Sequence, residues 1–336
     1  MPTRWTAAAL LPLLAGCNRY QSAMGGDAND GAHFISLFQI FLIVTGIAYA
    51  LVIAFLAVAL LRRRSEKTHA VESGTHHETN PGLNPALLGW GAFILVGLTG
   101  LSIASFFTDR SLAAPPRQPQ LSFAVTGNQW WWDVEYQGPT PDLNLRTANE
   151  LHLPVGVPVR IRLESRDVIH SFWVPNLAGK QDLIPGRTND IMFVPRRTGL
   201  YRGQCAEFCG TQHANMALTV QVESLADFKR WYAAQLRPAQ APATPLAQAG
   251  YNYVTTRECS SCHAISGTTA GGRVGPDLTH LASRRTIAAA ALTMSKGNLY
   301  GWVADPQSQK PGTKMPTMPL RPDELHAIVA YLEGLK

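Results

Sequence analysis

The chain has 336 residues, of which 46% are hydrophobic and only 15% are charged, and its formal net charge is +6. The length predicts two or three domains, and the low share of charged residues is typical of a membrane-attached protein. No run of five or more Lys or Arg residues occurs, which excludes a basic nucleic-acid-binding tract.

Residues 1–17 predict a lipoprotein-type signal peptide. A basic start is followed by a short apolar stretch and by small residues before a cysteine, and this order is typical of a secretory signal. The tetrad LAGC, which ends at Cys17, resembles the cleavage box of bacterial lipoproteins. That resemblance implies that Cys17 becomes the lipidated first residue of the mature chain. The alternatives are a plain signal, or an uncleaved N-terminus, with an inert Cys17.

Residues 30–110 contain two long apolar runs, at 34–61 and 86–107. As a helix the first run spans about 40 Å, more than the roughly 30 Å of a bilayer's hydrocarbon core. The arginines at 62–64 follow it directly and place that end in the cytoplasm by the positive-inside rule. We therefore expect a two-helix transmembrane hairpin whose long flanking segments both lie on the outer side of the membrane.

Residues 118–235 are predicted to form an all-β domain. Short strand-like runs are separated there by Gly, Pro and Asn turns, and Val159, Ile161 and Leu163 alternate with more polar neighbours. This pattern is typical of a β-sandwich or a Greek-key barrel. Three adjacent tryptophans, at 130–132, fall in another strand-like run. Because neighbouring side chains of a strand point to opposite faces, at least one of them is expected in the core.

One short stretch of this domain, QCAEFCGTQHANM, gathers two cysteines, a histidine and a methionine: Cys205, Cys209, His213 and Met216. Such a mixture of soft ligands selects copper. A mononuclear blue-copper site uses one Cys, two His and a weak axial Met, so the second Cys suits this loop to two bridged coppers. Another His must come from elsewhere, and His170 is the candidate because it is expected to end a strand-like run in DVIHSFWVP.

The same residues taken singly have simpler interpretations. Two Cys and a His bind zinc in many proteins, Met216 alone would usually be a core residue, and Glu207 alone would be a solvated carboxylate. Zinc sites rarely use methionine, however, and the second ligand pair typical of zinc modules is missing. The spacing and the residue types together therefore favour copper.

The loop resembles the binuclear copper (CuA) loop of cytochrome c oxidase subunit II. The resemblance covers roughly residues 30–235 and includes NQWWWDVEY, DVIHSFWVP and KQDLIPGRTND. It implies a cupredoxin-like domain in which two thiolates bridge the coppers, while two imidazoles, a thioether and a backbone carbonyl complete the site. The residues implied, in that order, are Cys205, Cys209, His170, His213, Met216 and Glu207.

The resemblance implies two further roles and shows one departure. The side chain of Glu207 matches a magnesium ligand at the contact with subunit I. Trp130 matches the tryptophan through which electrons reach the copper pair, although simple packing is the alternative. Arg166 departs from the family, because many relatives carry an acidic residue just before the aspartate matching Asp167. This departure argues against an acidic docking patch for a soluble cytochrome at this place.

An Ala/Pro-rich linker at 236–249 separates the copper domain from residues 250–336, which are predicted to bind haem c. Cys259, Cys262 and His263 form C-x-x-C-H, the c-type haem attachment motif, in which both sulfurs bond to the porphyrin and the histidine binds the iron. A redox-active C-x-x-C is the alternative. The segment resembles the all-α class I cytochrome c fold.

A methionine is expected as the sixth ligand of the iron. Met315 is our choice because its surroundings resemble the K-P-G-x-x-M-P pattern of this family, and Met318 is the runner-up. The dipeptide at 275–276 resembles the family's turn in which a carbonyl orients the proximal histidine. Residues 322–335 are predicted to form a closing amphipathic helix.

These patterns together predict the electron-transfer subunit of an aerobic respiratory oxidase of the caa-type, within the haem–copper oxidase family. Electrons from cytochrome c or another donor would enter through haem c and CuA and leave to subunit I. There, the resemblance implies, oxygen is reduced to water with proton pumping, so no catalytic residue is expected in this chain. The expected partners are subunit I and subunit III, and not nucleic acid. The expected location is the bacterial inner membrane, multi-pass, with the copper and haem domains outside.

Three other classes of protein fit part of this pattern. A quinol oxidase subunit that has lost its metals is opposed by the intact ligand loop. A copper enzyme such as nitrous oxide reductase would need a large additional histidine-rich domain, which is missing. A lipid-anchored electron shuttle that works alone is the main alternative, although an anchor needs only one helix.

Overall fold

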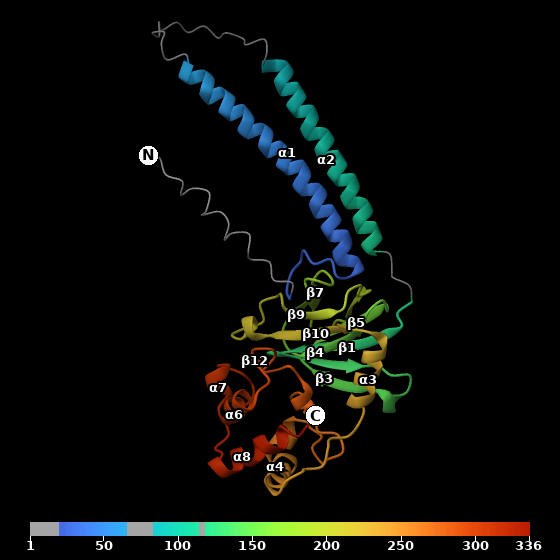
Figure 1. The fold of residues 1–336 in the computed structure, drawn as a ribbon, viewed down its shortest axis with the longest axis vertical. Coiled ribbons are helices and arrows are strands. Elements are labelled where there is room, and N and C mark those ends of the chain that lie inside the picture. The colour runs from blue at the N-terminus through green and yellow to red at the C-terminus, as the bar shows by residue number, and fades with distance from the viewer. Residues whose placement is uncertain (1–19, 66–82, 114–117) are drawn as a thin grey trace. The chain divides into compact units, whose positions relative to one another are not determined.

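Figure 1 shows the computed structural model, which describes residues 20–65, 83–113 and 118–336. The chain divides into two compact units, of which one comprises residues 32–114 and the other the segments on either side. The predicted signal peptide, with Cys17, lies outside the described residues.

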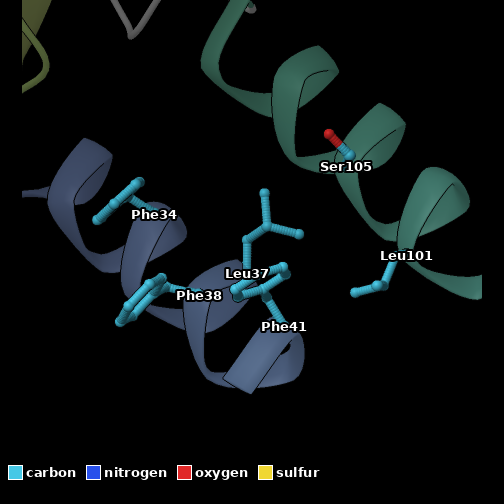
Figure 2. Close-up of a pocket in the computed structure, with 6 residues that line it drawn as sticks. All are labelled: Phe34, Leu37, Phe38, Phe41, Leu101 and Ser105. Atoms are coloured by element: carbon cyan, nitrogen blue, oxygen red, sulfur yellow. The ribbon is translucent and has the colours of Figure 1, made fainter. Parts of the chain in front are cut away.

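Two long helices form the first architectural element. α1 (Asn29–Ser65) and α2 (Leu83–Ala113) contain the two predicted apolar runs and extend beyond them at both ends. Both are long and apolar enough to cross a membrane. Facing turns of the two helices line an apolar crevice of about 260 Å³, which Figure 2 shows. Its walls are Phe34, Leu37, Phe38, Phe41, Leu101 and Ser105.

The β domain consists of two five-stranded sheets, with the orders β3-β2-β1-β5-β8 and β4-β10-β9-β6-β7. Most neighbours are antiparallel, but β1 pairs in parallel with β5, and β4 with β10. The strands are β1 (Leu121–Asn128), β2 (Trp131–Tyr136), β3 (Leu145–Ala148), β4 (Glu150–Pro154), β5 (Val159–Ser165), β6 (His170–Trp173), β7 (Gln181–Leu183), β8 (Asn189–Phe193), β9 (Gly199–Cys205) and β10 (Ala217–Glu223).

The core of this domain lies between the inner faces of the two sheets. The predicted alternation in β5 is confirmed, since Val159, Ile161 and Leu163 are fully buried while Arg160 and Arg162 are exposed. This period of two is what a strand with one face in a core requires. Helix α3 (Leu225–Gln235), capped by Ser224, follows the last strand.

His170 was expected to end a strand, and this was wrong, because it begins β6. The residues before it form a turn in which the Asp167 carboxylate accepts a hydrogen bond from the Val168 amide and the Ser165 hydroxyl donates to the Val168 carbonyl. The apolar side chains at 168 and 169 are exposed there. This turn separates β5 from β6, which belong to different sheets, so β6 begins only at His170.

The C-terminal domain is helical. Its elements are α4 (Pro245–Thr256), α5 (Glu258–Cys262), η5 (Leu281–Ser283), β11 (Thr286–Ile287), β12 (Leu292–Thr293), α6 (Lys296–Ala304), α7 (Pro306–Gln309) and α8 (Pro322–Leu332). α4 begins inside the predicted linker at 236–249, because the Thr244 hydroxyl caps it by accepting from the Ala247 amide. α8 is amphipathic as predicted and buries its apolar face.

Helices α4 and α8 pack closely where Gly250 faces Ala327. A Cβ at Gly250 would lie 1.9 Å from the Ala327 carbonyl oxygen, so no larger residue fits without moving a helix. This contact fixes the two helices that frame the C-terminal core. Two apolar helices, a β-sandwich of cupredoxin type and a helical domain thus follow one another along the chain, as predicted.

Candidate metal centres

Four of the predicted copper ligands lie around the turn between β9 and β10. Cys205 is the last residue of β9, Met216 directly precedes β10, and His213 begins the short 3-10 helix η4 (His213–Asn215). The Cys205 amide donates to the Met216 carbonyl (2.8 Å), which closes the turn into a compact loop. The adjacent strand β6 contributes His170, since Phe172 pairs with Cys205.

The donor atoms of these residues converge. The two sulfurs of Cys205 and Cys209 are 3.7 Å apart, too far for a disulfide. His170 Nδ1 lies 3.9 Å from the Cys205 sulfur, and His213 Nδ1 lies 3.7 Å from the Cys209 sulfur. The Met216 sulfur is 3.9 Å from that of Cys209. Each thiol therefore has its own imidazole nitrogen.

This donor set fits a copper pair. It offers two thiols, two imidazole nitrogens and a thioether, which are the soft and borderline ligands that copper prefers. Cys205, Cys209 and Met216 are buried, as is His170. The backbone of Glu207 adds a carbonyl oxygen 3.1 Å from the Cys205 sulfur, while its side chain is exposed.

The thiols of Cys205 and Cys209 interact directly, with their sulfurs 3.7 Å apart. The hydrogen bond with the Cys209 thiol is the main reason that the pKa of Cys205 is lowered to about 3, against the effect of burial. The same interaction raises the pKa of Cys209. The two thiols therefore do not titrate independently.

Asp167 orients the buried imidazole of His170. Its Oδ1 lies 2.8 Å from His170 Nε2, so that Nδ1 is left to face the sulfurs. Burial alone would raise the pKa of Asp167, but hydrogen bonds from His170, from the Gln129 and Val168 amides and from Lys314 outweigh it and lower that pKa. A carboxylate behind a ligating histidine fixes its ring and its tautomer. No motif in the sequence assigned this role to Asp167.

The predicted haem residues line one cavity of about 380 Å³. Cys259, Cys262 and His263 lie on its wall together with Met315 and Met318. Its lining is mostly apolar and both cysteines are free thiols, which suits a covalently attached porphyrin. Both methionines remain candidates for the iron, because both line the same cavity.

The proximal histidine is held by the turn predicted to orient it. His263 Nδ1 lies 2.7 Å from the Pro276 carbonyl oxygen, which leaves Nε2 for the iron. A Cβ at Gly275 would lie 2.7 Å from His263 Cε1, so the turn needs glycine to approach the ring. Burial lowers the pKa of His263 and thus favours the neutral form that binds a metal.

Trp130 contacts both candidate centres. Its indole Nε1 donates to the Cys209 carbonyl (2.9 Å), and the residue also lines the haem cavity. Trp132 instead is fully buried and packs edge-on against His170 and Phe172. The prediction that at least one of the three tryptophans packs in the core is confirmed by Trp132.

Arg166 was the one departure from the expected family pattern, and it contacts the haem domain. Its Nη1 donates to the Arg273 carbonyl (3.2 Å), and its Nη2 lies 3.4 Å from Asp133. Arg146 binds Asp133 through two hydrogen bonds and lies 3.5 Å from the Gly275 carbonyl. Arg166 therefore faces the chain's own haem domain. The sequence did not predict this contact, because it joins segments that are far apart along the chain.

Two family models match the chain. The model described as cytochrome c oxidase subunit II, periplasmic domain, matches residues 138–223, and the cytochrome c model matches residues 247–336. The chain is 31% identical to cytochrome c oxidase subunit 2 of Alkalihalophilus pseudofirmus, over 84% of this chain and 81% of that protein. It is 30% identical to the Bacillus subtilis protein of the same name, over 98% of this chain and 96% of that protein.

A solved structure, the periplasmic domain of subunit II of cytochrome oxidase of Bradyrhizobium japonicum, is 30% identical. The match covers 35% of this chain and 95% of the solved chain, with a TM-score of 0.33. The fold and its two ligand clusters define an electron-transfer protein, in which a cupredoxin-type domain and a c-type cytochrome follow apolar helices. The chain belongs to the cytochrome c oxidase subunit 2 family.

Proposed function

We propose that this chain receives electrons at haem c and delivers them through a binuclear copper centre to subunit I of a caa-type terminal oxidase. The donor would be cytochrome c or another reductant, and oxygen would be reduced in subunit I with proton pumping. One observation carries the proposal: Trp130 lines the haem cavity, and its indole donates a hydrogen bond to the carbonyl of Cys209. A single residue thus links the two candidate centres.

The residues that would hold each group follow from their donors. Cys205 and Cys209 would bridge the coppers, with His170, His213 and Met216 as terminal ligands and Glu207 contributing its carbonyl. Cys259 and Cys262 would attach the haem, with His263 and Met315 on the iron. When bound, each group takes up and releases one electron at a time.

The protein's own part in this proposal is to keep the ligands still. His170 stands on a strand, Cys205 ends another, and Asp167 fixes the imidazole from behind. Ligands supported by regular elements and by hydrogen-bonded neighbours are held more accurately than ligands on a free loop. Little rearrangement would then accompany each change of oxidation state.

The remaining assignments concern attachment and assembly. The exposed carboxylate of Glu207 would bind magnesium at a contact with subunit I. Helices α1 and α2 would cross the bacterial inner membrane as a hairpin beside subunit I, with subunit III completing the complex. Lipidation of Cys17 remains a prediction, which the intact mass of the purified protein tests: an unmodified Met1 would contradict it.

Metal and optical analysis of the full chain, purified in mild detergent, tests the function. We expect two coppers and one haem c per chain, a near-infrared copper band, and co-purification of a second haem-bearing membrane subunit. Zinc, or no metal, in the loop of a folded protein would overturn the copper assignment. A fully loaded chain that purifies alone would instead favour the lipid-anchored shuttle.

A further inference from the structure

Lys310 is the one lysine buried among the residues that the structure describes, and only 2% of it is exposed. Its Nζ donates to three backbone carbonyls, those of Trp130 (2.8 Å), Asn215 (2.7 Å) and Ala288 (3.2 Å). No carboxylate of the described residues pairs with it, so this ammonium is held by carbonyl dipoles alone. A buried charge is costly unless such partners compensate it.

The three carbonyls belong to two different domains. Trp130 and Asn215 lie in the copper domain, whereas Ala288 and Lys310 itself lie in the haem domain. The two acceptors in the copper domain flank the proposed copper site, because the indole of Trp130 bonds to Cys209 and Asn215 directly precedes Met216. The ammonium thus fixes both flanks of the ligand loop to the haem domain.

The haem-domain side of this contact has an unusual backbone. Ala288, Ala289 and Ala290 have φ angles of 55°, 60° and 58°, a left-handed conformation that residues with a Cβ rarely adopt. Their carbonyls accept in turn from Lys310, from the Ala217 amide (3.1 Å) and from Arg202 Nη1 (3.4 Å). Ala217 follows the proposed ligand Met216 directly. Such a turn persists only where its surroundings impose it.

A reciprocal hydrogen bond completes the contact. The buried side chain of Gln212, in the copper loop, donates through Nε2 to the carbonyl of Pro311 (2.7 Å), which follows Lys310. Burial lowers the pKa of Lys310 to about 7. The three carbonyl acceptors match the protonated amine, because only that form has three hydrogens to donate.

We propose that Lys310 is a positioning residue for electron transfer between the two domains: its ammonium ties Trp130 and the copper-ligand loop to the left-handed turn at 288–290. The inference rests on the proposed function, because it presumes haem and copper in their sites. It explains why a lysine is buried here without a carboxylate. A hydrophobic residue would fill the same space but could not hold three carbonyls at fixed distances.

The test is the rate at which an electron passes from haem to copper in the full, metal-loaded chain. A soluble ruthenium photoreductant delivers one electron to the haem, and optical bands of haem and copper follow its transfer. Lys310→Met keeps most of the length of the unbranched side chain and removes every donor. We expect it to slow this transfer roughly tenfold or more, since a misplacement of about 1 Å between reacting groups costs up to about 10²-fold.

Two readouts separate positioning from damage to the sites. The haem spectrum and the copper paramagnetic resonance of Lys310→Met should match those of the unaltered chain, and so should both reduction potentials. The matched control is Lys296→Met, since Lys296 is exposed and pairs with Glu333 within the haem domain. Its transfer rate should be unchanged.

The outcomes are distinct. A normal rate in Lys310→Met overturns the inference, as does a slow rate accompanied by shifted potentials or an altered copper signal. If this variant does not accumulate with both groups bound, Lys310→Gln replaces it; we expect its transfer to be slowed as well, and a normal rate there also overturns the inference. Absence of haem-to-copper transfer in the unaltered chain would instead refute the proposed function.

Discussion

Asp167 accepts a hydrogen bond from His170 Nε2 at 2.8 Å, and the same carboxylate lies 3.1 Å from Lys314 Nζ of the haem domain. One side chain therefore supports a proposed copper ligand and also meets the other domain. Because carboxylates behind ligating histidines tune metal affinity, we expect Asp167 to strengthen copper binding.

Asp167→Asn should weaken copper binding roughly 10–100-fold, the usual effect of losing such a partner. Competition with a chelator of known affinity measures it. Lys314→Met removes only the contact to the haem domain and should leave the copper affinity unchanged. Asp142→Asn, at an exposed carboxylate far along the chain from the ligands, serves as the neutral control. Equal affinities in all four proteins would contradict the orienting role.

Trp130→Phe should slow electron transfer from haem to copper while leaving the metal content unchanged. The substitution keeps an aromatic ring but removes the indole N–H that bonds to the Cys209 carbonyl. The flash-photoreduction assay described above measures the rate. Trp131→Phe is a matched control, because Trp131 lines the haem cavity without a hydrogen bond to Cys209 among the contacts described. A rate as slow in that control would remove the special role of Trp130.

Met315→Leu should abolish the weak absorption band that arises from methionine bound to haem iron. It should also lower the reduction potential, because methionine ligation raises it. Met318→Leu is the paired variant, since both methionines line the haem cavity. Survival of the band in Met315→Leu, and its loss in Met318→Leu, would transfer the assignment to Met318.

Gly250→Ala should destabilise the haem domain by about 1–3 kcal/mol, the usual cost of overfilling a packed interface. The added Cβ would lie 1.9 Å from the Ala327 carbonyl oxygen. Thermal unfolding followed in the haem absorption band measures the change. Gly297→Ala, in α6, meets no atom within 4 Å and should instead stabilise by about 0.5–1 kcal/mol, as for glycine in a helix.

Acid should loosen the loop that carries both methionines. Asp305 accepts from the Thr317 hydroxyl (2.7 Å) and from the amides of Gln307 and Ser308. The Thr317 bond, followed by the others, lowers the pKa of Asp305 against the effect of burial. A carboxylate with a lowered pKa stabilises the fold fully above its ordinary pKa of about 3.9, and this stabilisation is lost as the pH falls through the lowered value.

The methionine-to-iron band should therefore be retained at pH 5 and weaken only below about pH 4. Asp305→Ala, which lacks the acceptor at any pH, should show a weaker or less heat-stable band already at pH 7. An acid titration of the oxidised protein checks both statements. Identical titrations of the two proteins would show that Asp305 does not hold the loop.

The sequence predicted an all-β domain, but it did not predict several of the strands. β3, β7 and β9 lack the alternating apolar pattern, and β9 (GLYRGQC) is defined by its pairing with β10 and β6. The position of His170 at the start of β6 was likewise missed, because the two β-branched residues just before it, Val168 and Ile169, resemble a strand. Pairing partners distant in sequence decided these boundaries.

The sequence alone predicted most of each ligand set, because most of each set lies within a short stretch. Four side-chain copper donors fall within one loop, and C-x-x-C-H places two thiols beside a histidine, whereas His170 and the iron methionine lie elsewhere in the chain. The tertiary structure alone decided how the two domains meet. Arg166 and the turn at 288–290 lie in no recognised motif, and the K-P-G-x-x-M-P pattern that contains Lys310 gave no sign of its contacts with the copper domain. These residues gain their contacts from segments dozens to more than a hundred positions away. Burial and hydrogen-bond geometry at that contact depend on how the copper and haem domains pack together, and no short sequence motif encodes that packing.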